Sequence, residues 1–191
     1  MWIDTHAHLV SEAFDADRDD VIERAARAGV ARIVCIGDSL DASRQAVALA
    51  HAWDGVYATA GIHPHQAAQA PSDFEGELKA LLQQEKVVAI GETGLDYHYD
   101  FSPRETQQNV FRRHIRLAVD MGLPLVVHNR EADDDLLQIL KEEGAERASG
   151  VLHCFWSDSE AARKALDMGF YLGVGGPVTF KNTGDLREGL K

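Results

Sequence analysis

The chain contains little cysteine and no paired cysteine motif. Only Cys35 and Cys154 occur among its 191 residues, and both lie in apolar stretches without the spacing of a zinc-thiolate site. Two cysteines are too few for the disulfide framework of a small secreted domain, so we expect a reducing compartment. We interpret both as packing residues, because alternation along a strand turns Cys154 to the face opposite its neighbour His153.

Long apolar runs and positive charges are also scarce. No segment approaches 18 consecutive apolar residues, and the first residues lack the basic region and cleavage signal of an exported protein. We therefore predict a cytoplasmic protein without membrane contact. The 19 lysines and arginines are outnumbered by 31 aspartates and glutamates, for a formal net charge of -12. This balance argues against a broad basic surface for duplex DNA, and a phosphate substrate would need local cations or bound metal ions.

Apolar, β-branched runs alternate with helical stretches along the whole chain. Seven runs predict strands, at residues 2–9, 31–37, 56–63, 87–94, 124–129, 149–155 and 170–178. Three Ser-x-x-Glu segments, which begin at Ser72, Ser102 and Ser157, are typical of capping boxes at helix starts. Four glycines are expected just past helix ends: Gly29, Gly122, Gly144 and Gly169. No linker interrupts the pattern, so we predict one domain over residues 1–191.

This alternation predicts an α/β fold with a parallel sheet, either doubly wound or closed as a (β/α)8 TIM barrel. No G-x-G-x-x-G follows the first strand, and "GVGGPV" at 173–178 lacks the Lys and Ser/Thr of a phosphate loop. The barrel is favoured because histidines and one glutamate gather at the carboxyl ends of the predicted strands, where barrel enzymes build their active sites. These residues are His6, His8, His63, His65, Glu92, His128 and His153.

The first two members of this set, His6 and His8, are separated by a single residue. Along a strand, His6 and His8 point the same way and can close on one metal ion, although an isolated His-x-His is equally consistent with two polar residues at a strand end. Histidine and carboxylate ligands without thiolates suit a divalent ion in an open catalytic site. A single glutamate among them, Glu92, can bridge two ions. We interpret His51 and His114 as surface or packing residues.

Six short motifs in order closely resemble the TatD-type metal-dependent deoxyribonucleases. They are "THAHL" (5–9), "GIHPH" (61–65), "GETGLDYH" (91–98), "VVHNRE" (126–131), "LHCF" (152–155) and "YLGVGGPVTFKN" (171–182). The resemblance implies an amidohydrolase-like barrel that hydrolyses phosphodiesters with two divalent ions (Zn, Mg or Mn). DNA is the implied substrate, and the acidic surface favours short or single-stranded ends.

Carried over to this sequence, the resemblance implies a metal ligand set. His6 and His8 would bind one ion, and His128 and His153 would bind the second. Glu92 would bridge the two.

The resemblance also implies residues around the metals. His63 and His65 are expected to act in catalysis, either as contacts to the substrate phosphate or by orienting the ligands. Three further polar residues follow strands on the same rim and either reach a phosphate or are ordinary loop side chains: Arg130, Lys181 and Asn182.

This sequence ends within the predicted helix after the seventh strand, so we expect a barrel truncated after strand 7. In the resembling family the eighth strand supplies an aspartate to the first metal site, and no residue here matches it. Two alternatives therefore stay open: a related barrel hydrolase acting on a small amide, ester or lactone, and an inactive truncated form that only binds metal or phosphate. The sequence does not indicate an oligomeric state.

Overall fold

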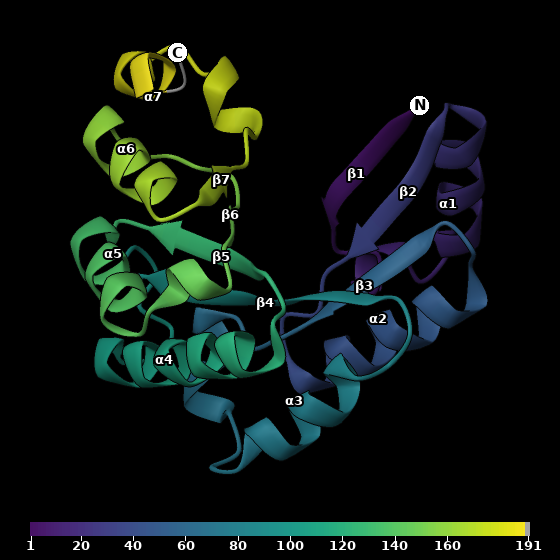
Figure 1. The fold of residues 1–191 in the computed structure, drawn as a ribbon. Coiled ribbons are helices and arrows are strands. Elements are labelled where there is room, and N and C mark those ends of the chain that lie inside the picture. Colours follow the sequence, from purple (N-terminus) through teal and green to yellow (C-terminus); the bar gives the residue numbers. More distant parts are fainter. Residues whose placement is uncertain (190–191) are drawn as a thin grey trace.

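Seven parallel strands form one sheet in the computed structural model, which describes residues 1–189 (Figure 1). The strands are β1 (Trp2–Ala7), β2 (Val30–Cys35), β3 (Val56–Ala60), β4 (Val87–Asp96), β5 (Leu125–Arg130), β6 (Gly150–Leu152) and β7 (Phe170–Leu172). The helices are α1 (Arg18–Arg27), α2 (Leu40–Ala52), α3 (Phe74–Leu82), α4 (Arg104–Met121), α5 (Asp133–Glu142), α6 (Ser159–Asp167) and α7 (Gly184–Gly189). Short 3-10 helices include η2 (Pro64–Gln69) and η4 (Gly176–Thr179).

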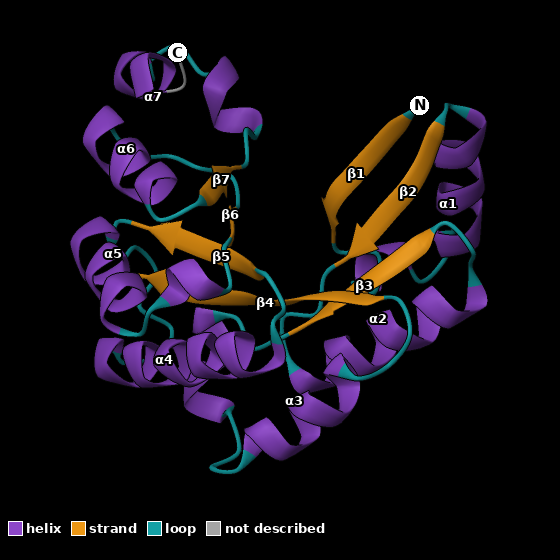
Figure 2. Cartoon of the chain, in the orientation of Figure 1, coloured by secondary structure: helices purple, strands orange, loops and turns teal. Residues whose placement is uncertain are grey.

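The strand order decides between the two predicted architectures. A doubly wound sheet reverses its order at a switch point, whereas this sheet runs from β1 to β7 without reversal. Figure 2 shows the sheet curled into a half-barrel with the helices on its outer side. The barrel-type prediction is therefore confirmed, with β1 and β7 as the two edges of the described sheet.

The predicted segment boundaries are only partly correct. All four helix-ending glycines have positive φ, from 65° at Gly122 to 92° at Gly29. The capping boxes are wrong. In place of Ser157, Asp158 caps α6 by accepting hydrogen bonds from two backbone N–H groups. Ser102 Oγ instead donates to the carbonyl of His65, and Asp73, in place of Ser72, precedes α3 without a side-chain cap.

The core lies between the sheet and the helices that cover it. One contiguous cluster joins strand residues such as Ile90 and Leu125 to helix residues such as Phe111, Leu136 and Leu140. Because the central strands are covered by helices and by one another, β4 is buried along almost its whole length. This burial holds in place the strands whose carboxyl ends carry the polar residues of the site.

Two glycines allow β4 to lie close to β5. Gly91 and Gly94 have φ values of 144° and 142°, which L side chains rarely adopt. A Cβ atom on Gly94 would also meet the backbone carbonyl oxygen of His128 at 2.0 Å. The "GETG" motif therefore has a packing reason, because it sets the spacing between Glu92 on β4 and His128 on β5.

His114 is a structural histidine, as the sequence predicts. Its ring lies in α4 with no solvent exposure and stacks on Phe74. Nε2 accepts a hydrogen bond from the backbone N–H of Ile62 (3.1 Å), and Nδ1 donates to the carbonyl of Val110 (2.8 Å). Burial lowers the pKa of His114 from 6.5 to about 4, so the ring is neutral in the folded protein near neutral pH.

We expect this histidine to make stability fall as the pH is lowered from 6.5 towards 4. In that window the unfolded chain binds a proton that the folded ring excludes, so the contribution is fully present above pH 6.5 and decreases below it. Between about pH 7 and about pH 5 the loss amounts to about 2 kcal/mol. In urea unfolding, His114→Gln should show a pH dependence that is smaller by this amount. An unchanged pH dependence would contradict the assignment.

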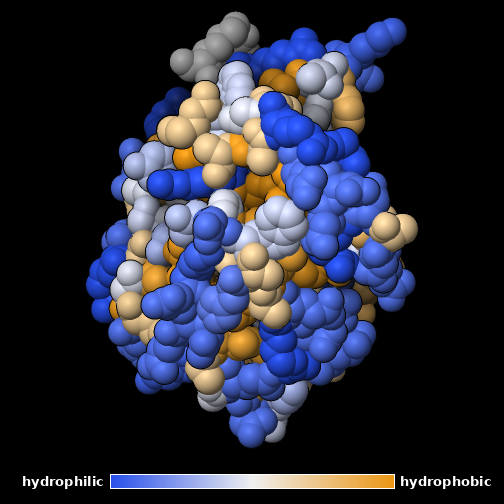
Figure 3. Space-filling model, turned by 90° about the vertical axis from the view of Figure 1, so that its right-hand side faces the viewer, coloured by the Kyte–Doolittle hydropathy of each residue, from blue (hydrophilic) through white to orange (hydrophobic). Residues whose placement is uncertain are grey.

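The surface is mostly hydrophilic, in keeping with the composition. Figure 3 views the side of the molecule that lies at the right in Figure 1, and hydrophobic residues interrupt the hydrophilic surface near its middle. Exposed large apolar side chains on β1 include Trp2 and Ile3. Within residues 1–189, no helix combines the length and the apolar composition needed to cross a bilayer.

Candidate active site

The histidines predicted from strand ends meet on one rim of the half-barrel. His6 lies in β1 and His8 follows it, while His63 and His65 belong to the turn after β3. His128 lies in β5 and His153 comes directly after β6. Glu92 does not end its strand as predicted, because β4 continues to Asp96. All of these side chains except His6 line a pocket of about 360 Å³, together with Asp38, Gln66, Asp96, Tyr99 and Arg130.

Glu92 is the centre of this arrangement. Its side chain is buried, with 2% of the residue exposed, and its two oxygens face different imidazoles. Oε2 lies 3.3 Å from His6 Nε2 and 3.5 Å from His8 Nε2. Oε1 lies 3.3 Å from His128 Nδ1 and 4.0 Å from His63 Nε2. The carboxylate thus stands between two sets of nitrogen atoms.

The imidazoles group differently from the expected ligand pairs. His153, expected beside His128, instead stacks on His6 with ring centroids 3.3 Å apart. His6, Glu92 and His153 offer ligand atoms within 4.8 Å of one another, and so do His63, Glu92 and His128. The structure therefore brings all five expected ligands to one carboxylate but sets His153 with the β1 histidines.

Asp96 is a site residue that the sequence reasoning did not single out. Its Oδ2 accepts hydrogen bonds from Nε2 of His65 (2.9 Å) and of His128 (3.0 Å). Its Oδ1 accepts from the backbone N–H groups of His98 and Tyr99. Because Asp96 follows Glu92 by four residues on the same strand, period-two alternation would have placed both on one face. Asp96 therefore fixes the orientation of His65 and His128.

The electrostatics of the site favour two ionised carboxylates, Glu92 and Asp96, and a neutral His153. Burial opposes ionisation of Glu92, but hydrogen bonds from His128 and His6 outweigh it and hold the pKa of Glu92 well below its usual value. Burial likewise opposes ionisation of Asp96, and hydrogen bonds from Tyr99, His65 and His128 lower its pKa to about 2. Burial lowers the pKa of His153 to about 4.

His63 and His128 differ in what their ring nitrogens can do. Burial lowers the pKa of His63 to about 3, so its ring is neutral. Its Nδ1 accepts the N–H of His65 (3.2 Å), which leaves the proton on Nε2 and makes this atom a donor. His128 donates Nε2–H to Asp96 and turns Nδ1 towards Glu92. Nδ1 of His128 therefore offers a lone pair whenever that ring is neutral, whereas Nε2 of His63 keeps its proton.

Burial would lower the pKa of His128, but its contacts with Glu92 and Asp96 raise it above the usual value. Because it lies between two carboxylates, the His128 ring holds a proton at a position where a metal cation could bind in its place. This is the arrangement in which a carboxylate orients a metal-binding histidine through its other nitrogen.

The remaining predicted residues have varied outcomes. Arg130, at the end of β5, lines the pocket, whereas Lys181 and Asn182 are exposed beyond η4 and are not among its lining residues. Cys35 is fully buried, as predicted. The interpretation of Cys154 as a core residue is wrong. Since β6 ends at Leu152, strand alternation does not extend to Cys154, which is half-buried and lines a second pocket on the rim.

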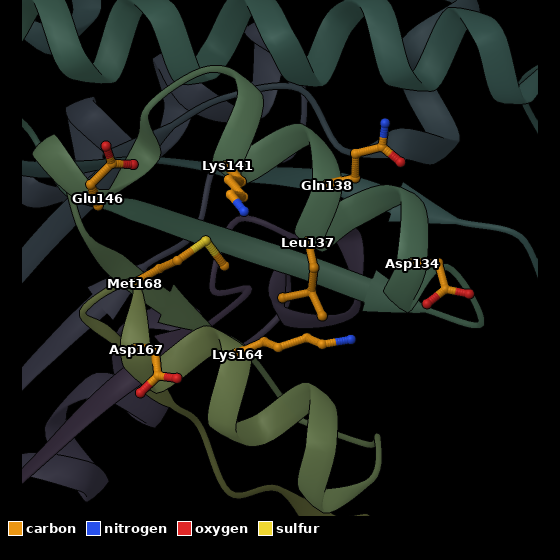
Figure 4. A pocket seen from close by; sticks show the side chains of 8 residues that line it. All are labelled: Asp134, Leu137, Gln138, Lys141, Glu146, Lys164, Asp167 and Met168. Atoms are coloured by element: carbon orange, nitrogen blue, oxygen red, sulfur yellow. The ribbon is translucent and has the colours of Figure 1, made fainter.

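A larger hollow lies away from these histidines, on the outer side of the sheet. It has a volume of about 770 Å³ between α5 and α6 (Figure 4). Figure 4 shows Leu137 and Met168 among acidic, basic and amide side chains from the two helices and from the turn after α5. This mixed lining is typical of a seam between surface helices, and its size alone does not make it the candidate site.

The donor set fits divalent metal ions. Two ligands about 2.0 Å from a tetrahedral ion lie about 3.3 Å apart. The contacts of Glu92 with His6 and with His128 have this length, and the Nε2 atoms of His6 and His8 are 3.2 Å apart. The imidazole nitrogens that face the buried Glu92 carboxylate would give their lone pairs to a cation bound there. The residues present are therefore able to hold a metal ion.

Comparisons with known proteins identify the family. The family model described as TatD related DNase matches residues 3–191. The chain belongs to this family. It is 47% identical over 191 residues to the uncharacterized metal-dependent hydrolase YabD of Bacillus subtilis, an alignment that covers 100% of this chain and 75% of YabD.

Other members of the TatD family support the assignment. The 3'-5' ssDNA/RNA exonuclease TatD of Cronobacter sakazakii is 38% identical over 188 residues, which cover 98% of this chain and 70% of that protein. The solved structure of YJJV, a TatD homologue from Escherichia coli K12, superposes with a TM-score of 0.91 at 31% identity and covers 99% of this chain and 73% of its own. The family-level prediction of a metal-dependent hydrolase is thus confirmed.

Proposed function

We propose that this protein is a deoxyribonuclease that cleaves phosphodiester bonds of DNA with two divalent ions, Zn, Mg or Mn, at the Glu92 rim. The observation that carries the proposal is the division of the Glu92 carboxylate between two sets of imidazoles. The name of the Cronobacter relative, a ssDNA/RNA exonuclease, supports a nucleic-acid substrate.

Five residues are proposed as metal ligands. His6 and His8 would hold one ion and His128 the second, with Glu92 facing both sets of nitrogen atoms. His153, which stacks on His6, completes the set. When bound, the ions supply a water of lowered pKa and positive charge for the phosphate.

The neighbouring side chains prepare the site for a phosphate. Asp96 holds His128 and His65 in place, so that neither ring has to reorient when substrate binds. His63 carries a proton on Nε2, and we propose that this atom and His65 contact the substrate phosphate. Arg130 lines the same pocket, and no carboxylate of the described residues lies within 4.0 Å of its guanidinium. It is therefore available as a local cation on an acidic protein.

The test compares substrates with and without metal. The purified protein is stripped with chelator, reloaded with Mg²⁺, Mn²⁺ or Zn²⁺, and incubated with an end-labelled single-stranded oligonucleotide and with a panel of esters and lactones. We expect metal-dependent shortening of the oligonucleotide that chelator abolishes. Metal-dependent hydrolysis of esters or lactones alone would favour the related small-molecule hydrolase. Metal binding without turnover of any substrate would favour a non-catalytic form.

A further inference from the structure

Aromatic side chains gather at the mouth of the site. Tyr99 and Phe101 are 50% and 66% exposed, and their rings stack with centroids 5.4 Å apart. Trp156, on the loop after β6, is 47% exposed. Single exposed aromatic residues are common on protein surfaces, but several around one pocket indicate a binding surface.

Arg130 connects these rings. Its guanidinium carbon lies 5.3 Å from the centroid of Tyr99 and 5.6 Å from that of Trp156. These distances allow cation–π contact with both rings. The neighbouring carboxylate of Glu131 pairs with His98 instead (2.8 Å). The positive charge of Arg130 is therefore held between two flat apolar faces and remains available to a phosphate.

The aromatic residues stand over two adjoining pockets. Tyr99 lines the Glu92 pocket, whereas Trp156 lines a second pocket of about 420 Å³. The two pockets share three lining residues: His128, Arg130 and His153. A chain that places a phosphate at the shared residues therefore has an aromatic face available on either side of it.

We propose that these residues form a stacking platform for the bases that flank the bound phosphate, and that the platform selects single-stranded nucleic acid. The platform consists of Tyr99, Phe101, Arg130 and Trp156. The proposal rests on the proposed function, since it names how the same site holds its substrate. Every base has an aromatic face, so stacking tolerates any sequence, whereas bases in a duplex are already stacked and paired. A net charge of -12 leaves little non-specific attraction, which makes such contacts more important for binding.

The experiment measures binding without cleavage. Fluorescence anisotropy at low ionic strength, with chelator present, compares a labelled oligothymidylate with an abasic oligonucleotide of equal length and charge. We expect the protein to bind the oligothymidylate about tenfold more tightly. Tyr99→Ala and Trp156→Ala should each remove most of this preference while leaving abasic binding nearly unchanged, because they delete a stacking face and no charge.

Trp2→Ala is the matched control. Trp2 is 72% exposed but lies at the start of β1, at the opposite end of the strand from the site, so its removal should not change the preference. Equal affinity of the unmodified protein for the two oligonucleotides, or equal losses for both in the variants, would overturn the platform. Metal-dependent hydrolysis of bis(p-nitrophenyl) phosphate, which needs no stacked base, tests the proposed function separately.

Discussion

Replacing Glu92 by glutamine should reduce metal-dependent hydrolysis by a factor on the order of 10³ and abolish binding of at least one ion. The side chain is buried, and each of its oxygens faces its own set of imidazoles. A neutral amide cannot balance the charge of two dications, and its NH2 group would direct hydrogens at one of the ligand sets. Calorimetric titration with Mn²⁺ measures the stoichiometry and the affinity.

Glu131→Gln is the matched control for this change. Glu131 is a carboxylate on the same rim, but it pairs with His98 and does not contact the imidazoles around Glu92. The control should keep the metal stoichiometry of the unmodified protein. Unchanged stoichiometry and affinity in Glu92→Gln would refute the bridging role.

Replacing Asp96 by asparagine should lower activity or metal affinity by about 10- to 100-fold without removing any proposed ligand. Both rings, His65 and His128, donate to the same atom, Oδ2, while Oδ1 accepts two backbone N–H groups. An amide would therefore direct its NH2 hydrogens either at both rings or at these backbone donors. Loss of the negative charge should also lower the pKa of His128, which contact with Asp96 helps to raise. NMR titration of the histidine rings follows this pKa directly.

Asp38→Asn separates this effect from a general loss of negative charge. Asp38 lines the same pocket, but it is partly exposed and lies 3.8 Å from His8 Nδ1. Its replacement should have a smaller effect on metal affinity and leave the pKa of His128 nearly unchanged. Equal effects of the two substitutions would show that Asp96 acts through charge alone and not by orienting the rings.

The strand pattern and the rim were predictable because both follow from local periodicity. Apolar runs located all seven strands, and parallel strands bring their carboxyl ends to one edge, so His6, His128 and His153 were correctly expected together. The helix ends at glycines were predictable for the same reason, since a positive φ is a local requirement.

The details that the sequence did not indicate depend on tertiary contacts. The stacking of His153 on His6 follows from the curl of the sheet, which brings the residue after β6 close to β1, and no sequence spacing encodes that curl. Asp96 acts through two histidine partners, and one of them, His128, lies on the neighbouring strand. The two come close because Gly94 and His128 are opposite each other in the register of β4 and β5. Ser102, which was predicted to cap a helix, instead donates a hydrogen bond to the backbone carbonyl of His65 in the turn after β3.

The most direct test of the account is a crystal structure of the protein soaked with Mn²⁺, with the ions located by anomalous scattering. We expect two peaks, one at each oxygen of Glu92. The first should contact His6 and His8, and the second should contact Nδ1 of His128, with Nε2 of that ring still donating to Asp96. A single peak, or peaks that do not contact Glu92, would contradict a two-ion site centred on this carboxylate.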